Sequence, residues 1–162
     1  MSKAEELAAK LKQKQQTPAD ADATADLAIE HWPTQVYEMY HQLETWLEPL
    51  TEAGLNIRRV PTRVFESLPT GATFNYAIDK LQIDGNRKTL TLDPIARFII
   101  GGTGRVDILG NDKQLYIHRT ENDHGESQWQ IQTIARTGQP RPAPVKLDED
   151  TFLQVIQDGL DL

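Results

Sequence analysis

Residues 105–118 read RVDILGNDKQLYIH, and this short stretch decides the fold. Apolar and polar residues alternate over residues 105–109 and again over residues 114–118. Alternation with a period of two is the pattern of a half-buried strand. The Gly110-Asn111-Asp112 sequence between the two runs is typical of a tight turn. The stretch therefore predicts two antiparallel strands joined by a turn.

The same period of two continues on both sides of this hairpin. Asp84-Gly85-Asn86 marks another tight turn, and the phase of the apolar residues slips between Ile78 and Leu81, which predicts a β-bulge. Pro61 is expected to end the first strand. From the strand-like runs we expect an antiparallel β-meander of about five or six strands, drawn from residues 56–60, 73–83, 89–92, 96–100, 105–109, 114–118 and 128–135. The run at residues 96–100 is more continuously apolar and suits either a strand buried on both faces or a sharp corner.

A long amphipathic helix is predicted before the meander, over residues 24–54. We expect Pro33 in its first turn, a break near Glu48 caused by Pro49, and Gly54 at its C-terminal cap. The apolar face is expected to cover the sheet, although its Trp and Tyr content also suits a dimer face. Its apolar residues recur at spacings of three and four: Val36, Met39, Tyr40, Leu43, Trp46, Leu47 and Leu50.

A short helix is predicted after the meander, over residues 148–159, with Asp148 as its N-cap. The fold class is therefore α+β: an antiparallel β-meander packed by a long N-terminal amphipathic helix and a short C-terminal helix. We assign residues 24–162 to one domain. Residues 1–23 are predicted to be a mobile N-terminal helix and linker, because residues 15–23 are small, polar and interrupted by proline.

The composition limits the class of protein. The 162 residues include 17 Lys and Arg, 24 Asp and Glu and no Cys, which gives a net charge of −7. No run approaches the roughly 18 apolar residues of a membrane span, and the absence of Cys excludes disulfides and thiolate chemistry. The negative charge argues against a general nucleic-acid coat. The N-terminal residues lack the features of a secretory signal, so we expect a cytoplasmic protein with no membrane contact.

Positive charge is concentrated in the middle of the chain. The net charge is −5 over residues 1–50, +2 over residues 51–100 and −4 over residues 101–162. Such a cluster can bind an acidic protein surface or a phosphate backbone, or it can pair with the chain's own carboxylates. The candidate partner- or anion-binding residues are Arg58, Arg59, Arg63, Arg97 and Arg105.

A glycine-rich string directly precedes Arg105. Loops of this composition bring backbone N–H groups close to phosphate, which makes the string a candidate ligand loop. It matches neither GxGxxG nor GxxxxGK[ST] and is followed by a strand instead of a helix, which favours a flexible strand connection. The residues of the string are Gly101, Gly102, Thr103 and Gly104.

Metal-ligating residue types gather over residues 118–126. Imidazole and carboxylate groups suit zinc or manganese, but the spacing matches no defined site, and the ordinary turn residues among them favour a solvated hairpin tip. We therefore predict no metal and no cofactor. The residues concerned are His118, Glu121, Asp123, His124 and Glu126.

No coherent catalytic motif is present, and we predict no catalytic residues. The favoured hypothesis is a non-catalytic cytoplasmic protein-binding module, such as an inhibitor, an immunity-type protein or a regulatory factor, whose acidic surface attracts a basic partner. One alternative is a small-ligand- or phosphate-binding protein or enzyme that uses residues 101–105 with Asp107, Arg97 or His118. Another is nucleic-acid contact through the arginines of the middle segment. The chain is predicted to be a monomer or a homodimer.

Overall fold

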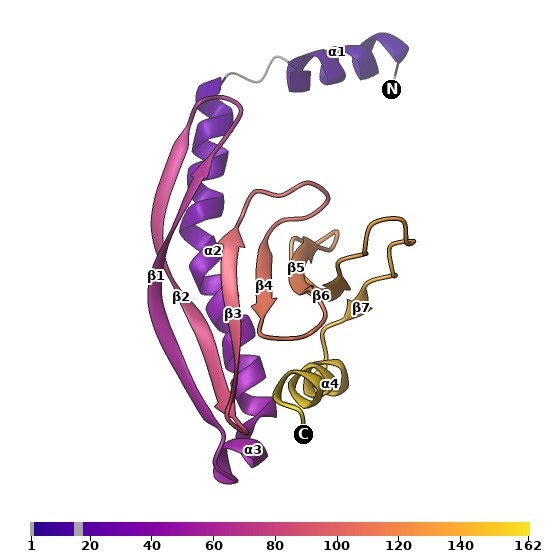
Figure 1. Cartoon of the computed structure of the whole chain (residues 1–162). Coiled ribbons are helices and arrows are strands. Elements are labelled where there is room, and N and C mark those ends of the chain that lie inside the picture. The colour runs from indigo at the N-terminus through magenta and orange to yellow at the C-terminus, as the bar shows by residue number, and fades with distance from the viewer. Residues whose placement is uncertain (1, 15–17) are drawn as a thin grey trace.

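The computed structural model describes residues 2–14 and 18–162, and the side chains of residues 2–11 and 24–162. It confirms the predicted α+β class. In the described part of the chain, seven strands form one antiparallel sheet in chain order, β1 to β7 (Figure 1). The sheet is therefore slightly larger than predicted. The strand bounds are Asn56–Ser67, Thr73–Gly85, Lys88–Ala96, Arg105–Leu109, Leu115–Glu121, Ser127–Thr133 and Val145–Lys146.

Four helices accompany the sheet in the same described residues. Pro33 lies inside α2 instead of in a first turn, because α2 begins earlier than predicted. The predicted break near Glu48 is confirmed, since Pro49 occupies the first turn of α3. Asp148 is the N-cap of α4, as predicted, and accepts a hydrogen bond from the Thr151 N–H at 2.9 Å. The helix bounds are Lys3–Lys14 (α1), Pro18–Trp46 (α2), Glu48–Glu52 (α3) and Glu149–Leu160 (α4).

The N-terminal segment only partly follows its prediction. Residues 18–23, expected to belong to a linker, are helical and form the start of α2. Residues 15–17 of the expected linker lie outside the described residues. The side chains of residues 2–11, which include most of α1, are all exposed. This part of α1 therefore packs its apolar residues against nothing else in the described chain.

β1 and β2 pair along their whole length, so the prediction that Pro61 ends the first strand is wrong. Asp79 lies opposite Pro61, yet it uses its backbone on its other side. There its N–H donates to the Tyr37 hydroxyl and its C=O accepts from the Tyr40 hydroxyl, both at 2.9 Å. Because Asp79 directs its backbone groups away from β1, the Pro61 nitrogen points to the unpaired side of the edge strand. Proline, which has no N–H, is tolerated there.

The predicted β-bulge in β2 is also wrong, because the pairing of β1 with β2 is continuous along both described strands. The burial pattern changes phase for another reason. Tyr76 and Ile78 are buried on one face of the β1–β2 ribbon, and Leu81 and Ile83 on the other. Only Leu81–Gly85 of β2 pairs with β3, and the rest of the ribbon extends beyond the sheet alongside α2 (Figure 1).

Residues 96–100 lie at a corner, the second of the two predicted alternatives, and do not form a separate strand. β3 ends after a register shift at Pro94, and the chain reverses through residues 97–104. Gly101 and Gly104 take the positive φ angles that the reversal requires. Within the apolar run, the centre of the Phe98 ring lies 5.7 Å from the centre of the Phe74 ring, whereas Ile100 is fully exposed.

α2 and α4 share one hydrophobic core with the sheet. The ring centroids of Trp46 in α2 and Phe152 in α4 lie 6.3 Å apart. Trp32 of α2 is fully buried against the sheet, and the Tyr40 hydroxyl of the same helix donates to the backbone of β2. Among the described helices, none has the length and apolar composition needed to cross a membrane.

Candidate functional site

The sheet face opposite the core, which we call the open face, carries rows of polar side chains. Arg105 Nε donates to Asp107 Oδ1 at 2.7 Å, and the Arg105 guanidinium carbon lies 4.1 Å from the centre of the Tyr116 ring. His118 Nε2 and Gln130 Oε1 are 2.9 Å apart. These groups satisfy one another across neighbouring strands. The strand register places on this face Asp93, Asp107, Tyr116 and Gln132 in one row and Arg105, His118 and Gln130 in the next.

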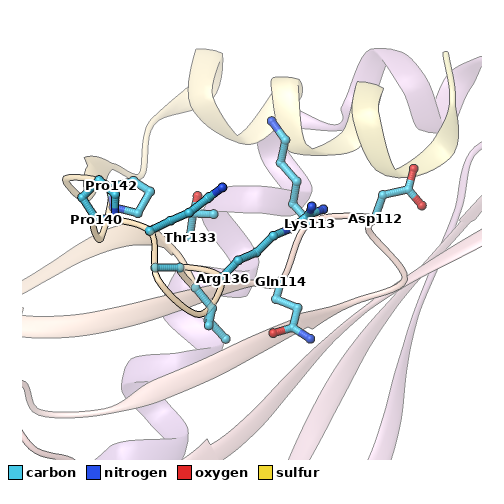
Figure 2. Close-up of a pocket in the computed structure, with 10 residues that line it drawn as sticks. Asp112, Lys113, Gln114, Thr133, Arg136, Pro140 and Pro142 are labelled. Atoms are coloured by element: carbon cyan, nitrogen blue, oxygen red, sulfur yellow. The ribbon is translucent and has the colours of Figure 1, made fainter.

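A hollow of about 410 Å³ lies beside the proline-rich segment that connects β6 to β7 (Figure 2). Lys113 and Arg136 line it together with Pro140 and Pro142. The segment is anchored because Gln132 Nε2 donates to the Pro142 carbonyl oxygen at 2.8 Å. Sequence reasoning missed this hollow, since its walls come from two segments that only the pairing of β5 with β6 brings together.

The three candidate arginines of β1 do not form a shared site. The Arg59 guanidinium lies over the ring of Tyr37, with its carbon 5.1 Å from the ring centre. The charge of each arginine is engaged by a different polar group of this chain. The groups nearest to Arg58, Arg59 and Arg63 are the Asp84 carboxylate at 3.8 Å, the Glu44 carboxylate at 3.0 Å and the Asn75 amide oxygen at 2.8 Å, respectively.

The other two candidate arginines lie beside the glycine-rich string. The side chain of Arg97 is only 14% exposed, and its guanidinium is 3.9 Å from the Glu121 carboxylate. Burial lowers the pKa of the Arg97 guanidinium, and the positive charge of Arg119 lowers it further. Arg105 is held by Asp107 on the open face. The structure thus brings Arg97 and Arg105 to the string but leaves the β1 arginines elsewhere.

The glycine-rich string packs tightly against its own sheet. The Thr103 N–H donates to the Arg119 carbonyl at 2.7 Å, and the Arg119 N–H donates to the Gly104 carbonyl at 2.8 Å. A Cβ at Gly104 would overlap the ring of Trp32, and a Cβ at Gly102 would lie 2.9 Å from the Arg119 carbonyl oxygen. The small residues therefore allow close packing here, and the Thr103 amide is already occupied within the fold.

Arg119 is a buried charge that the sequence analysis did not single out. It is 1% exposed. Its Nε donates to Ser127 Oγ at 2.7 Å, and its Nη1 donates to Thr103 Oγ1 at 2.9 Å and to Glu121 Oε1 at 2.7 Å. A signal was present, because position 119 continues the apolar alternation of residues 115 and 117 with a charged residue. The bonds of Arg119 tie the glycine-rich string to the β5–β6 hairpin.

Glu66 is a second buried charge that sequence reasoning missed. Its carboxylate accepts hydrogen bonds from the backbone N–H groups of Arg97 and Phe98 at 3.0 Å and from the Tyr76 hydroxyl at 2.6 Å. Burial raises the pKa of the Tyr76 hydroxyl, and the hydrogen bond to Glu66 raises it further. Glu66 thus caps the chain where β3 ends and the reversal begins.

The candidate metal ligands lie at the turn between β5 and β6. Glu121 is engaged by Arg119, and Asn122 Oδ1 accepts from the N–H groups of His124 and Glu126 at 2.9 and 3.0 Å, which shapes the turn. His118 points to Gln130 on the open face. Within the described residues, no group of three or more His, Asp or Glu side chains is placed to hold a metal ion.

Charge is divided sharply between the helical layer and the sheet. Residues 18–55 and 148–162, which hold α2, α3 and α4, contain 13 Asp and Glu and no Lys or Arg. Residues 56–147, which hold the sheet, contain 9 Asp and Glu and 13 Lys and Arg. Among the described side chains of the helical layer, only Glu44 and Asp161 form ion pairs, with Arg59 and Lys88. The outer helical surface is therefore an acidic face that the chain itself leaves largely unneutralised.

Comparisons of the chain with protein-family models, with curated proteins and with solved structures gave no match. Only this chain's own geometry and charge therefore bear on its function.

Proposed function

We propose that this chain is a cytoplasmic, non-catalytic protein-binding module whose partner presents a cationic surface to the acidic helical face. The observation that carries the proposal is the absence of any Lys or Arg from residues 18–55 and 148–162, against 13 carboxylates. Such one-sided charge on a folded surface accelerates encounter with an oppositely charged protein and selects against acidic ones.

The acidic face is built on rigid elements. Asp26, Glu30 and Glu38 project from α2, and Glu48 and Glu52 from α3, and all five are exposed. A surface of helices keeps the carboxylates at fixed spacings, which lowers the entropy lost when a partner docks. The open face of the sheet offers less to a charged partner, because its cations and anions already pair with one another.

The same charge division weighs against nucleic acid as the ligand. The acidic face repels phosphate, and Arg58, Arg59 and Arg105 each lie within 4 Å of a carboxylate of this chain. A second candidate function is the binding of a small anion in the hollow of Figure 2, because its lining includes two cations, Lys113 and Arg136, and one carboxylate, Asp112. Pyrophosphate and citrate should then raise the melting temperature, and the K113A/R136A variant should abolish that rise.

The experiment for the main proposal is a charge reversal on the acidic face. The E30K/E48K variant and a control, D112K/D123K, change the net charge equally, but only the first alters the helical layer. Immobilised full-length proteins are exposed to a lysine-rich peptide and to a host lysate at low and high salt. We expect E30K/E48K to lose at least tenfold in affinity for the peptide and to lose any stoichiometric protein partner. The control should retain both, and equal losses in the two variants would contradict the proposal.

A further inference from the structure

The helical layer leaves part of the core side of the sheet uncovered. A groove of about 850 Å³ lies between α2 and the β5–β6 hairpin. Met39, Leu43 and Trp46 of α2 form one wall, and Trp129 and Leu147 lie across from them. Met39, Leu43 and Leu147 are buried, so a helix seated in the groove would pack chiefly on the partly exposed rings of Trp46 and Trp129.

The rim of the groove has its own charge. Glu38 and Glu126 line it, with Lys146 as the one cation of the lining. Glu38 belongs to the acidic face, which continues along α2 on either side of the groove. The surface that fits this groove is a helix with a narrow apolar stripe and basic flanks.

α1 has these properties. Leu7 and Leu11, one helical turn apart, are 53% and 58% exposed. The helix contains four Lys and two Glu, so it is positive while the helices of the layer are negative. At about 18 Å, it is long enough to run along the groove segment of α2, residues 38–46, which covers about 12 Å.

The chain's own α1 is too short to reach this groove. The groove begins at Glu38, about 30 Å along α2 from Pro18 at 1.5 Å per residue. From Lys14 to Pro18 the chain spans at most about 14 Å. Leu7 lies about 10 Å from Lys14 along α1. Even with the connection fully extended, these two lengths together are shorter than the distance of about 30 Å from Pro18 to the groove. An α1 seated in this groove must come from another molecule.

We propose that α1 of one copy seats Leu7 and Leu11 in the groove between α2 and the β5–β6 hairpin of a second copy. Reciprocal exchange gives a closed two-fold dimer, in which each copy supplies the helix that the other lacks. Lys3 and Lys10, which flank Leu7 at helical spacings, then face Glu38 and Glu126 at the rim of the groove. A seated α1 would cover Glu38 but not Glu30 or Glu48, which do not line the groove, so the test of the basic partner and the tests below can fail separately.

The first test is the oligomeric state of the full chain, measured by light scattering over a concentration series. Wild type should dimerise, and L7D/L11D should weaken the dimer at least tenfold, because it places carboxylates against an apolar, acid-rimmed groove. The control A9D/Q13D adds the same charge on the opposite side of α1 and should keep most of the dimer. A monomer at every concentration, or a dimer unaffected by L7D/L11D, overturns the proposal.

The second test locates the contact, and the lack of cysteine in the chain makes it specific. Protein carrying L7C is mixed with protein carrying Q42C, at the groove, or T89C, on β3 away from it, and a short bismaleimide is added. The L7C and Q42C pair should cross-link into a covalent dimer several-fold faster than the L7C and T89C pair. Equal rates would mean that α1 does not select the groove.

Discussion

The helical layer and the open face of the sheet handle charge in opposite ways. The open face interleaves cations and anions, so that Arg105 meets Asp107 and Lys80 lies 3.8 Å from Asp93. The helical layer exposes carboxylates of one sign and pairs only Glu44 and Asp161 within the described chain. A surface whose charges already pair with one another gains little electrostatic free energy from a charged partner. A surface with unpaired charges of one sign gains more when an oppositely charged partner binds. The comparison therefore favours the helices as the proposed interaction surface.

The sheet also depends on the helical layer for its structure. The ring of Trp32 in α2 fills the space that Gly104 leaves at the start of β4. Tyr37 and Tyr40 of α2 bond the backbone of β2 at Asp79, where β3 no longer accompanies that strand. The sheet thus needs α2 for its packing and for part of its backbone hydrogen bonding.

The largest effect is expected where the layers touch. G104A places a Cβ inside the Trp32 ring at a position with φ of 151°, and it should cost about 3 kcal/mol of unfolding free energy or prevent folding. G101A, with φ of 80° and open space around it, should cost only about 1–2 kcal/mol. Chemical denaturation measures both. An equal cost for the two variants would show that the layers do not meet tightly at Gly104.

The next effect concerns the support that α2 gives to β2. Y37F/Y40F removes both hydroxyls and leaves the N–H and C=O of Asp79 without these partners, at a cost of about 2 kcal/mol. Y116F on the open face removes a hydroxyl that, among the described side chains, accepts a hydrogen bond from the exposed Arg141 at 2.9 Å, and it should cost under about 0.5 kcal/mol. Similar costs for the two would contradict the dependence of β2 on α2.

A smaller loss of stability is expected at the end of β3, where the stabilising contacts come from the sheet and not from a helix. E66Q replaces a carboxylate that accepts from two backbone N–H groups and the Tyr76 hydroxyl, and should cost about 1.5 kcal/mol. Hydrogen exchange should speed up first at residues 97–104, while α2 stays protected. Uniform loss of protection across both layers would argue against a local role for Glu66.

The smallest effect tests the charges of the open face. Burial raises the pKa of Asp93, and Asp107 raises it further, although Lys80 opposes the shift. A raised pKa means that the charged form is disfavoured in the folded state, which costs stability above that pKa. D93N should therefore raise the melting temperature slightly at pH 7, and the gain should fade as the pH falls toward the ordinary value of about 3.9.

D84N is the matched control for this pH dependence, with the opposite sign. The hydrogen bond from Thr89 Oγ1 lowers the pKa of Asp84, so its charged form contributes stability above the ordinary pKa and loses it as the pH falls through the folded value. D84N should lower the melting temperature at pH 7 and lose this effect in acid. Shifts of the same sign in the two variants would contradict the assignment.

The parts of the fold predicted from the sequence are those with a local cause. The alternation of residues 105–118, the break at Pro49 and the cap at Asp148 each depend on residues a few positions apart. The continuation of β1 through Pro61 does not, because it depends on β1 being an edge strand and on α2 bonding Asp79. For residues 96–100 the sequence left a buried strand and a sharp corner both open, because a continuous apolar run does not distinguish the two.

The same distinction applies to the candidate site. Arg119 carried a local signal, as a charged residue in an apolar alternation. Glu66 carried none, since it bonds backbone groups 31 and 32 residues away. The charge division was visible only coarsely, because fixed blocks of residues mixed the helices with the strands. Knowing where α2 ends and β1 begins reveals that every Lys and Arg of residues 18–162 lies between residues 56 and 147.

Pro61 also has a consequence for how molecules of this protein meet one another. β1 is a 12-residue strand at the rim of the sheet, and long exposed rims of this kind template edge-to-edge aggregation and amyloid growth. Proline interrupts the row of outward N–H donors near the middle of that edge strand. This break in the donor row disfavours edge-to-edge pairing of β1 strands from different molecules.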